Sequence, residues 1–162
     1  MGWQDKIAPP SASGGTGVII QYGALCWRMG EAGVEVLLIT SRDSGRWLIP
    51  KGWPMRGLAP EAAAAQEAWE EAGVEGVLNP VSLGRYGYHK ALSPESKVPC
   101  AVAVYGLRVV RVAEQFPEVT QRRRQWFPPE VAADLVQEPE LARIILDFVP
   151  PQEGRPAPIA GE

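Results

Sequence analysis

The stretch from Gly52 to Val74 constrains the fold most strongly, because it has the pattern of a loop followed by an acidic helix. Pro60 suits the first position of a helix, and Glu61 suits the positive end of the helix dipole. Gly73 is a natural residue at which a helix ends. The sequence therefore predicts a helix that begins at Pro60 and ends before Gly73.

Four glutamates lie in this predicted helix, and no Lys or Arg accompanies them. Glu67, Glu70 and Glu71 are spaced i, i+3 and i+4, so they share one face. Like charges at this spacing destabilise a helix by about 0.2–0.5 kcal/mol per pair. A divalent metal, above all Mg²⁺ with its preference for oxygen ligands, would turn that cost into a gain. A metal site is one interpretation, and a solvated acidic face is the other.

The opposite side of the helix carries small residues. We expect Ala65, Ala68 and Ala72 to lie there, with Trp69 beside them. Small side chains allow close approach to a flat surface, so this side is expected to pack on a sheet.

The chain has 162 residues and a formal net charge of -3. This length suits one compact domain with its own core. The charge argues against bulk attraction to nucleic acid or to a membrane surface. The N-terminus shows no apolar signal core, and no apolar run is long enough to cross a bilayer. We therefore expect a cytoplasmic protein with no membrane partner.

Cys26 and Cys100 both lie in apolar, strand-like runs, and the chain has no CxxC motif. We expect two buried, reduced thiols, and a disulfide is the alternative.

Strand and helix patterns alternate along the chain and are flanked by two Pro/Gly-rich ends. We expect a loose arm over 1–16, a single domain over 17–148 and a disordered tail over 149–162. Strands are expected over 17–29, 34–41, 46–50, 77–92, 98–112 and 122–127, and helices over 60–72, 128–136 and 138–148. Strands with helices at two places indicate the α/β class, as an α/β/α sandwich with a mixed β-sheet.

The loop and helix together resemble the Nudix box. That pattern is Gly, five residues, Glu, seven residues, Arg-Glu, an apolar residue, any residue, Glu-Glu, any residue, Gly and an apolar residue. Leu58 stands where the first Glu belongs, and Gln66 stands where the Arg belongs. The matching positions are Gly52, Glu67, Glu70, Glu71, Gly73 and Val74. The order of strands and helix is also that of the Nudix fold, and the resemblance extends over about 17–148.

The second half of the chain resembles one branch of this family, the diphosphoinositol-polyphosphate and diadenosine-polyphosphate phosphohydrolases. The similar segments are short: Tyr88-His89-Lys90, Val98-Pro99-Cys100, Phe116-Pro117-Glu118 and 122–127 followed by a helix.

The resemblance implies cleavage of a pyrophosphate bond with the help of a divalent metal. Glu67 and Glu71 would hold Mg²⁺, or Mn²⁺, and the carbonyl of Gly52 would be a further ligand. Glu70 would be the catalytic base or would orient the water. The assignment of the base stays open, because the titrations of crowded carboxylates are coupled. Glu114 or Glu118 could add a ligand from a later loop; simple solvation is the alternative for both.

Several cations are candidate contacts for substrate phosphates. Strand alternation places Arg122 and Arg124 on one side and Arg123 on the other. Arg suits phosphate because its planar fork binds two oxygens. The alternative is a charged, solvated sheet edge. We predict Lys51, Arg56, Arg122 and Arg124 as substrate-binding residues.

The sequence thus predicts a magnesium-dependent Nudix pyrophosphohydrolase acting on a small diphosphoinositol or diadenosine polyphosphate. The alternatives are another Nudix substrate (a nucleoside triphosphate, nucleotide sugar or capped RNA) and a Nudix-fold nucleotide sensor without activity. Nucleic acid is not expected as a bulk partner. The oligomeric state is open, with a homodimer as one option.

Overall fold

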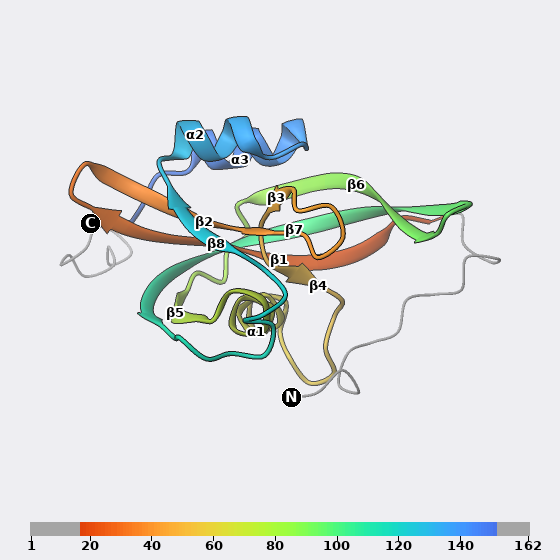
Figure 1. Ribbon diagram of the computed structural model, residues 1–162, viewed down its shortest axis with the longest axis horizontal. Helices are drawn as coiled ribbons and strands as arrows, with labels where there is room; N and C mark the ends of the chain where they lie inside the picture. Colours follow the sequence, from red (N-terminus) through yellow and green to blue (C-terminus); the bar gives the residue numbers. More distant parts are fainter. Residues whose placement is uncertain (1–16, 152–162) are drawn as a thin grey trace, which may run out of the picture.

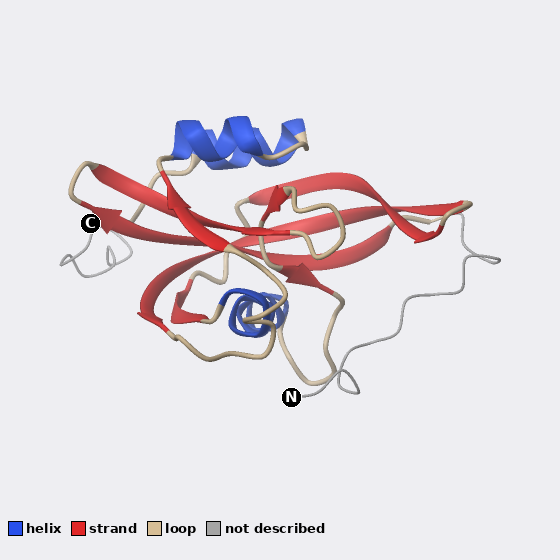
Figure 2. Cartoon of the chain, in the orientation of Figure 1, coloured by secondary structure: helices blue, strands red, loops and turns tan. Residues whose placement is uncertain are grey.

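The computed structural model describes residues 17–151, which form one sheet with helices on both of its faces (Figures 1 and 2). The predicted N-terminal arm and most of the predicted C-terminal tail lie outside the described residues. The strands are β1 (Ile19–Gly30), β2 (Gly33–Thr40), β3 (Trp47–Leu48), β4 (Lys51–Gly52), β5 (Val74–Leu78), β6 (Gly84–Ser93), β7 (Ser96–Val112) and β8 (Arg124–Phe127). The helices are α1 (Pro60–Ala72), α2 (Pro129–Leu135) and α3 (Pro139–Asp147).

The sheet is mixed, because β1 and β7 run parallel while the other pairs are antiparallel. Its eight strands follow the order β3-β2-β1-β7-β5, with β4 on β1, β6 on β7 and β8 on β2. Figure 1 shows α1 against one face and α2 with α3 against the other. The predicted α/β/α sandwich with a mixed sheet is therefore confirmed.

Each face of the sheet has its own core. On the side of α2 and α3 the core is built from large apolar side chains, among them Leu25, Tyr86, Leu141 and Ile145. On the side of α1 the helix contributes small residues, which pack on apolar side chains of the central strands. Small residues let the backbone of α1 lie close to the sheet, as its sequence predicts.

The ends of α1 agree with the sequence. Ala59 is the N-cap and Pro60 is the first helical residue. Gly73 adopts a left-handed conformation, with φ 68°, which a residue with a Cβ rarely adopts.

The face of α1 that packs on the sheet differs from the prediction. Ala64, Ala68 and Ala72 are buried against the sheet, whereas Ala65 and Trp69 are partly exposed. Glu67 and Glu71 belong to this buried face instead of lying opposite it. The prediction was wrong because Ala68 and Ala72 directly follow Glu67 and Glu71, about 100° around the helix and not opposite them.

Three predicted strands have different limits. The strand expected over 77–92 is two strands, β5 and β6, which pair with successive parts of β7. The segment between them contains Asn79-Pro80, where the Asn79 side chain accepts a hydrogen bond from the Val81 amide and forms a turn. The strand expected over 46–50 is shorter, because only Trp47–Leu48 pairs with β2 as β3; Lys51–Gly52, expected in the following loop, forms β4 on β1. Strand β8 begins at Arg124, two residues later than expected.

Cys26 and Cys100 are both buried and free, which excludes the disulfide alternative in this structure. Burial raises the pKa of the Cys26 thiol to about 12. Within 17–151, none of the helices has the length and apolar character needed to cross a membrane.

Candidate functional site

A small polar cavity of about 160 Å³ lies where α1, β4 and β6 meet the segment that precedes β8. We call it the polar cavity. It is lined by Gln21, Arg42, Leu48, Lys51, Gly52, Trp53, Glu67, Glu71, Tyr88, Lys90 and Arg122. Two carboxylates and four cationic side chains thus share one small space.

The two carboxylates come from successive turns of α1. Glu67 is 1% exposed and Glu71 is 8% exposed, so both are buried. Strand β4 brings the backbone against them, because Gly52 pairs with Tyr22 of β1. The amide of Lys51 donates to Oε1 of Glu71 at 3.3 Å.

The backbone at Gly52 lies close to the Glu67 side chain. A Cβ at position 52 would lie 2.3 Å from Cδ and Oε1 of Glu67, which is far inside van der Waals contact. The close approach therefore requires glycine, and it places main-chain polar groups beside a buried carboxylate.

Burial and mutual repulsion dominate the electrostatics of this pair. Desolvation, and then the charge of Glu67, raises the pKa of Glu71 well above its ordinary value. Arg122 opposes this effect, with Nη2 at 3.6 Å from Oε2 of Glu71. Desolvation also lowers the pKa of Lys51, while the charge of Glu71 opposes the change. Burial and the charge of Glu67 thus act on Glu71 in one direction, and the neighbouring cations Arg122 and Lys51 act in the other.

The donor set fits a hard divalent cation. Within residues 17–151 no three Asp, Glu, His or Cys side chains converge as a metal-binding group. Glu67 and Glu71 together with the backbone at Gly52 nevertheless supply oxygen donors in one place. Mg²⁺ is typically bound through one or two carboxylates and keeps several waters or phosphate oxygens, so two carboxylates suffice.

The sequence matches a known protein family over most of its length. The NUDIX domain model matches residues 20–148. The chain belongs to the Nudix family. The predicted resemblance is thereby confirmed for most of the described residues.

Curated relatives and solved structures agree with this assignment. "Nudix hydrolase 16, mitochondrial" of Arabidopsis thaliana is 35% identical over 111 residues, which cover 65% of this chain and 60% of the relative. The chain thus spans about 60% of that relative's length. "Diphosphoinositol polyphosphate phosphohydrolase 3-beta" of Bos taurus is 34% identical, with 70% of this chain and 66% of the relative covered.

The structural neighbours show the same fold. An Ap4A hydrolase of C. elegans matches with a TM-score of 0.57 at 17% identity, covering 80% of this chain and 94% of the other. The NUDIX domain of Shewanella oneidensis NrtR, solved with ADP ribose, matches with a TM-score of 0.61 at 13% identity, covering 91% and 98%.

The Nudix box keeps an orienting contact where its Arg is replaced. Nε2 of Gln66 donates to Oε2 of Glu70 at 3.0 Å. Glu70 is partly buried and is not among the residues that line the polar cavity. Gln66, which lines a different hollow beside α1, therefore holds the Glu70 carboxylate with a neutral donor in place of a charged one. Leu58 is partly buried and lines a different, shallow hollow beside α1.

Arg122 and Arg124 of the Nudix domain lie toward α1, as alternation predicts, but they make different contacts. Arg122 lines the polar cavity, where its Nε donates to Glu118 and its Nη1 to the carbonyl of Thr40. Arg124 instead donates through Nη1 to the carbonyl of Ala72 at 2.7 Å. Arg124 thus caps the C-terminus of α1, and these contacts favour a structural role for it.

The remaining predicted residues are spread around the site. Lys51 lines the cavity, with Nζ 4.9 Å from the centre of the Tyr88 ring. Arg56 is exposed and does not line it. Glu118 is paired with Arg122, and Glu114 is exposed.

Among the residues that line this cavity, sequence reasoning assigned no role to Gln21, Arg42, Tyr88 and Lys90, whose side chains carry polar groups. The hydroxyl of Tyr88 donates to Oε1 of Gln21, and Nζ of Lys90 lies 5.7 Å from the centre of the Trp53 ring. Tyr88 and Lys90 are two residues apart on β6, so strand alternation could have predicted that their side chains share one face. Arg42 lies in a turn and gave no such signal.

Proposed function

We propose that this Nudix protein is a hydrolase that cleaves a phosphoanhydride bond with the help of a divalent metal, Mg²⁺ or Mn²⁺. The observation that carries the proposal is the polar cavity, in which Glu67 and Glu71 are buried side by side and face four cations. Two adjacent buried carboxylates without a bound cation cost free energy. Such an arrangement is explained by a ligand that brings positive charge to the pair.

In this proposal Glu67 and Glu71 hold the metal, and the carbonyl of Gly52 adds an oxygen. The metal would polarise a phosphate oxygen and acidify water. Glu70 is the proposed base, because it lies one turn from Glu67 and accepts the hydrogen bond from Gln66 that orients its carboxylate. Glu70 would then remove a proton from the attacking water, a contribution of about 10²–10⁴-fold in rate.

The cations of the cavity would hold the phosphates that lie away from the metal. Lys51, Lys90 and Arg122 line it together with the more exposed Arg42. Arg122 is paired with Glu71 and Glu118, so it lies between the proposed metal ligands and the proposed phosphate contacts. Arg56 stays a predicted phosphate contact. Arg124 is better explained as the cap of α1.

A compound with several phosphates is the proposed substrate class, of the diphosphoinositol or diadenosine polyphosphate type. The number of cations around so small a cavity supports it, as do the names of the Bos taurus relative and the C. elegans neighbour. The proposed setting is cytoplasmic, with a small molecule as the partner. A homodimer stays an open prediction.

The experiment is a hydrolysis panel followed by phosphorus NMR. Diphosphoinositol polyphosphates, diadenosine polyphosphates, nucleoside triphosphates, ADP-ribose and capped RNA are each incubated with the protein and Mg²⁺ or Mn²⁺. We expect product only with metal, and the highest kcat/KM for a polyphosphate. Glu67→Gln should lower kcat by more than about a hundredfold, whereas Glu61→Gln, in the first turn of the same helix, should not.

Two results would change the proposal. If ADP-ribose or capped RNA is turned over preferentially, the protein is still a hydrolase, but the proposed polyphosphate substrate class is wrong. Binding without hydrolysis of any compound would indicate a nucleotide sensor, which the departures at Leu58 and Gln66 would then explain.

A further inference from the structure

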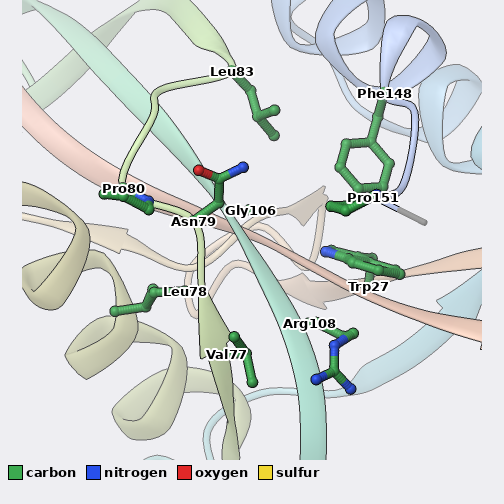
Figure 3. A pocket seen from close by; sticks show the side chains of 10 residues that line it. All are labelled: Trp27, Val77, Leu78, Asn79, Pro80, Leu83, Gly106, Arg108, Phe148 and Pro151. Carbon is green, nitrogen blue, oxygen red and sulfur yellow. The ribbon is translucent and has the colours of Figure 1, made fainter. Parts of the chain in front are cut away.

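The largest described cavity, of about 570 Å³, lies beside β7 under the end of α3 and shares no residue with the polar cavity (Figure 3). Trp27 forms part of its wall, but this side chain is 3% exposed and its ring packs on Phe148 at a centroid distance of 5.4 Å. Arg108, which brings the charge of the lining, already has an interaction partner. Packing between the sheet and α3 explains these residues, so ligand recognition belongs to the polar cavity.

Gln21 lines the polar cavity as a buried, neutral side chain. It is 3% exposed, and a buried amide requires hydrogen-bond partners. Its Oε1 accepts a hydrogen bond from the hydroxyl of Tyr88 at 2.5 Å. Within residues 17–151 no group accepts a hydrogen bond from its amide nitrogen. Gln21 therefore keeps an N–H donor for a ligand of the cavity that it lines.

Tyr88 reaches Gln21 across the strand that lies between them. Gln21 of β1 is opposite Val102 of β7, and Tyr88 of β6 is opposite Cys100 of the same strand. Figure 1 shows β7 running between β1 and β6. Burial raises the pKa of Tyr88, so its hydroxyl keeps the proton that it donates. The orientation of the Gln21 amide thus depends on a residue that is distant in sequence.

The ring of Tyr88 makes a second contact in the polar cavity. Nζ of Lys51 lies 4.9 Å from the centre of the ring, within the range of a cation–π interaction. The amide of Lys51 donates to Glu71, so the main chain of Lys51 is held at a proposed metal ligand while its side chain is held at Tyr88. Tyr88 therefore contacts two donors from different strands, one through its hydroxyl and one through its ring.

We propose that Gln21 is a further substrate-binding residue, whose amide nitrogen donates to a phosphate oxygen, and that Tyr88 is a positioning residue that fixes Gln21 and Lys51. The inference rests on the proposed function and deepens it, because it concerns substrate recognition in the same cavity. Donors that are already held in place lose little conformational freedom when a ligand binds. Such contacts bind substrate and transition state alike, so they act on KM more than on kcat.

Calorimetric titration measures binding without turnover. The probe is the bis-methylene analogue of tripolyphosphate, in which CH₂ groups replace the bridging oxygens and prevent hydrolysis, with Mg²⁺ present. Gln21→Glu keeps an oxygen that accepts from Tyr88 but replaces the N–H donor with an acceptor. It should raise the Kd of the probe at least about tenfold. Its KM for a polyphosphate should rise in parallel, while its kcat should change by less than about threefold.

A double-mutant cycle tests the positioning role. Tyr88→Phe should raise Kd about threefold to tenfold, because the Gln21 amide is no longer fixed. In the background of Gln21→Leu, Tyr88→Phe should have no further effect, because the hydroxyl acts only through the amide. Tyr88→Leu should weaken binding more than Tyr88→Phe, since Lys51 then also loses the ring. Tyr105→Phe removes the hydroxyl of another buried tyrosine, outside the polar cavity, and is the matched control with an unchanged Kd.

The outcomes separate this inference from the proposed function. An unchanged Kd in Gln21→Glu would overturn the Gln21 contact, and metal-dependent hydrolysis by the parent would still support the hydrolase. Additive effects of Gln21→Leu and Tyr88→Phe would overturn the positioning role. If Gln21→Leu does not fold, an unchanged Kd in Tyr88→Phe would overturn that role. If the parent binds no probe at all, both the inference and the polyphosphate substrate class are wrong.

Discussion

Both faces of the sheet bury apolar side chains, but the helices that cover them contribute different groups. The face under α2 and α3 buries large apolar side chains such as Leu141 and Ile145, both fully buried. The face under α1 buries alanines together with Glu67 and Glu71. Burial of apolar surface stabilises a fold, whereas burial of adjacent carboxylates opposes it. The comparison indicates that α2 and α3 add apolar packing, whereas α1 combines packing with the carboxylates proposed for chemistry.

The largest expected effect is on turnover after loss of a buried carboxylate. Glu67→Gln should lower kcat by more than about a hundredfold, in line with the contribution of groups at a reaction centre. Without metal the variant should melt at the same temperature or higher, because a repulsive buried charge is removed. Hydrolysis assays and thermal melts with and without Mg²⁺ measure both. A lower melting temperature together with full activity would show that Glu67 stabilises the fold and takes no part in catalysis.

The matching change on the opposite face should affect stability alone. Ile145→Ala removes a fully buried side chain and should reduce the free energy of unfolding by about 2–5 kcal/mol. Turnover per folded molecule should stay near that of the parent, because no residue of α3 lines the polar cavity. Urea denaturation and active-site titration check this. A fall in kcat of the folded variant would mean that the faces are coupled.

The two arginines beside α1 sharpen the comparison within one face. Arg122→Gln should raise KM for a polyphosphate about tenfold, since it removes a charged contact to phosphate. Arg124→Gln should leave KM unchanged and reduce stability by about 1 kcal/mol, because it removes a helix cap. Steady-state kinetics and chemical denaturation of both variants provide the test. The opposite pattern would place Arg124 at the substrate and Arg122 in the scaffold.

The smallest expected effect is at Gln66. Gln66→Arg should preserve or slightly raise kcat, because Arg can still donate to Glu70 and adds a charge. Kinetics with Mg²⁺ at several concentrations would detect a change of less than about threefold. Loss of activity would show that the surroundings of Glu70 have been rebuilt around the neutral amide.

Much of the fold could be predicted from local signals. Pro60 and Gly73 set the ends of α1 because each has a strong backbone preference of its own. The break between β5 and β6 was missed, although Asn79-Pro80 carried the signal, since the flanking residues look equally strand-like. No local sequence signal marks the division between β3 and β4. It arises because the two short strands pair with different partners, β2 and β1.

The sequence by itself determined the spacing of Glu67, Glu70 and Glu71 on one helix, the glycine at position 52, and through them the Nudix family. Only the tertiary structure decided which groups meet. Glu67 and Glu71 lie on the buried side of α1. Arg122 and Lys90 line the polar cavity, whereas Arg124 contacts the C-terminal end of α1. Spacing along one helix is a local property of the chain. Contacts between segments far apart in sequence depend on strand pairing and packing, which no local pattern encodes.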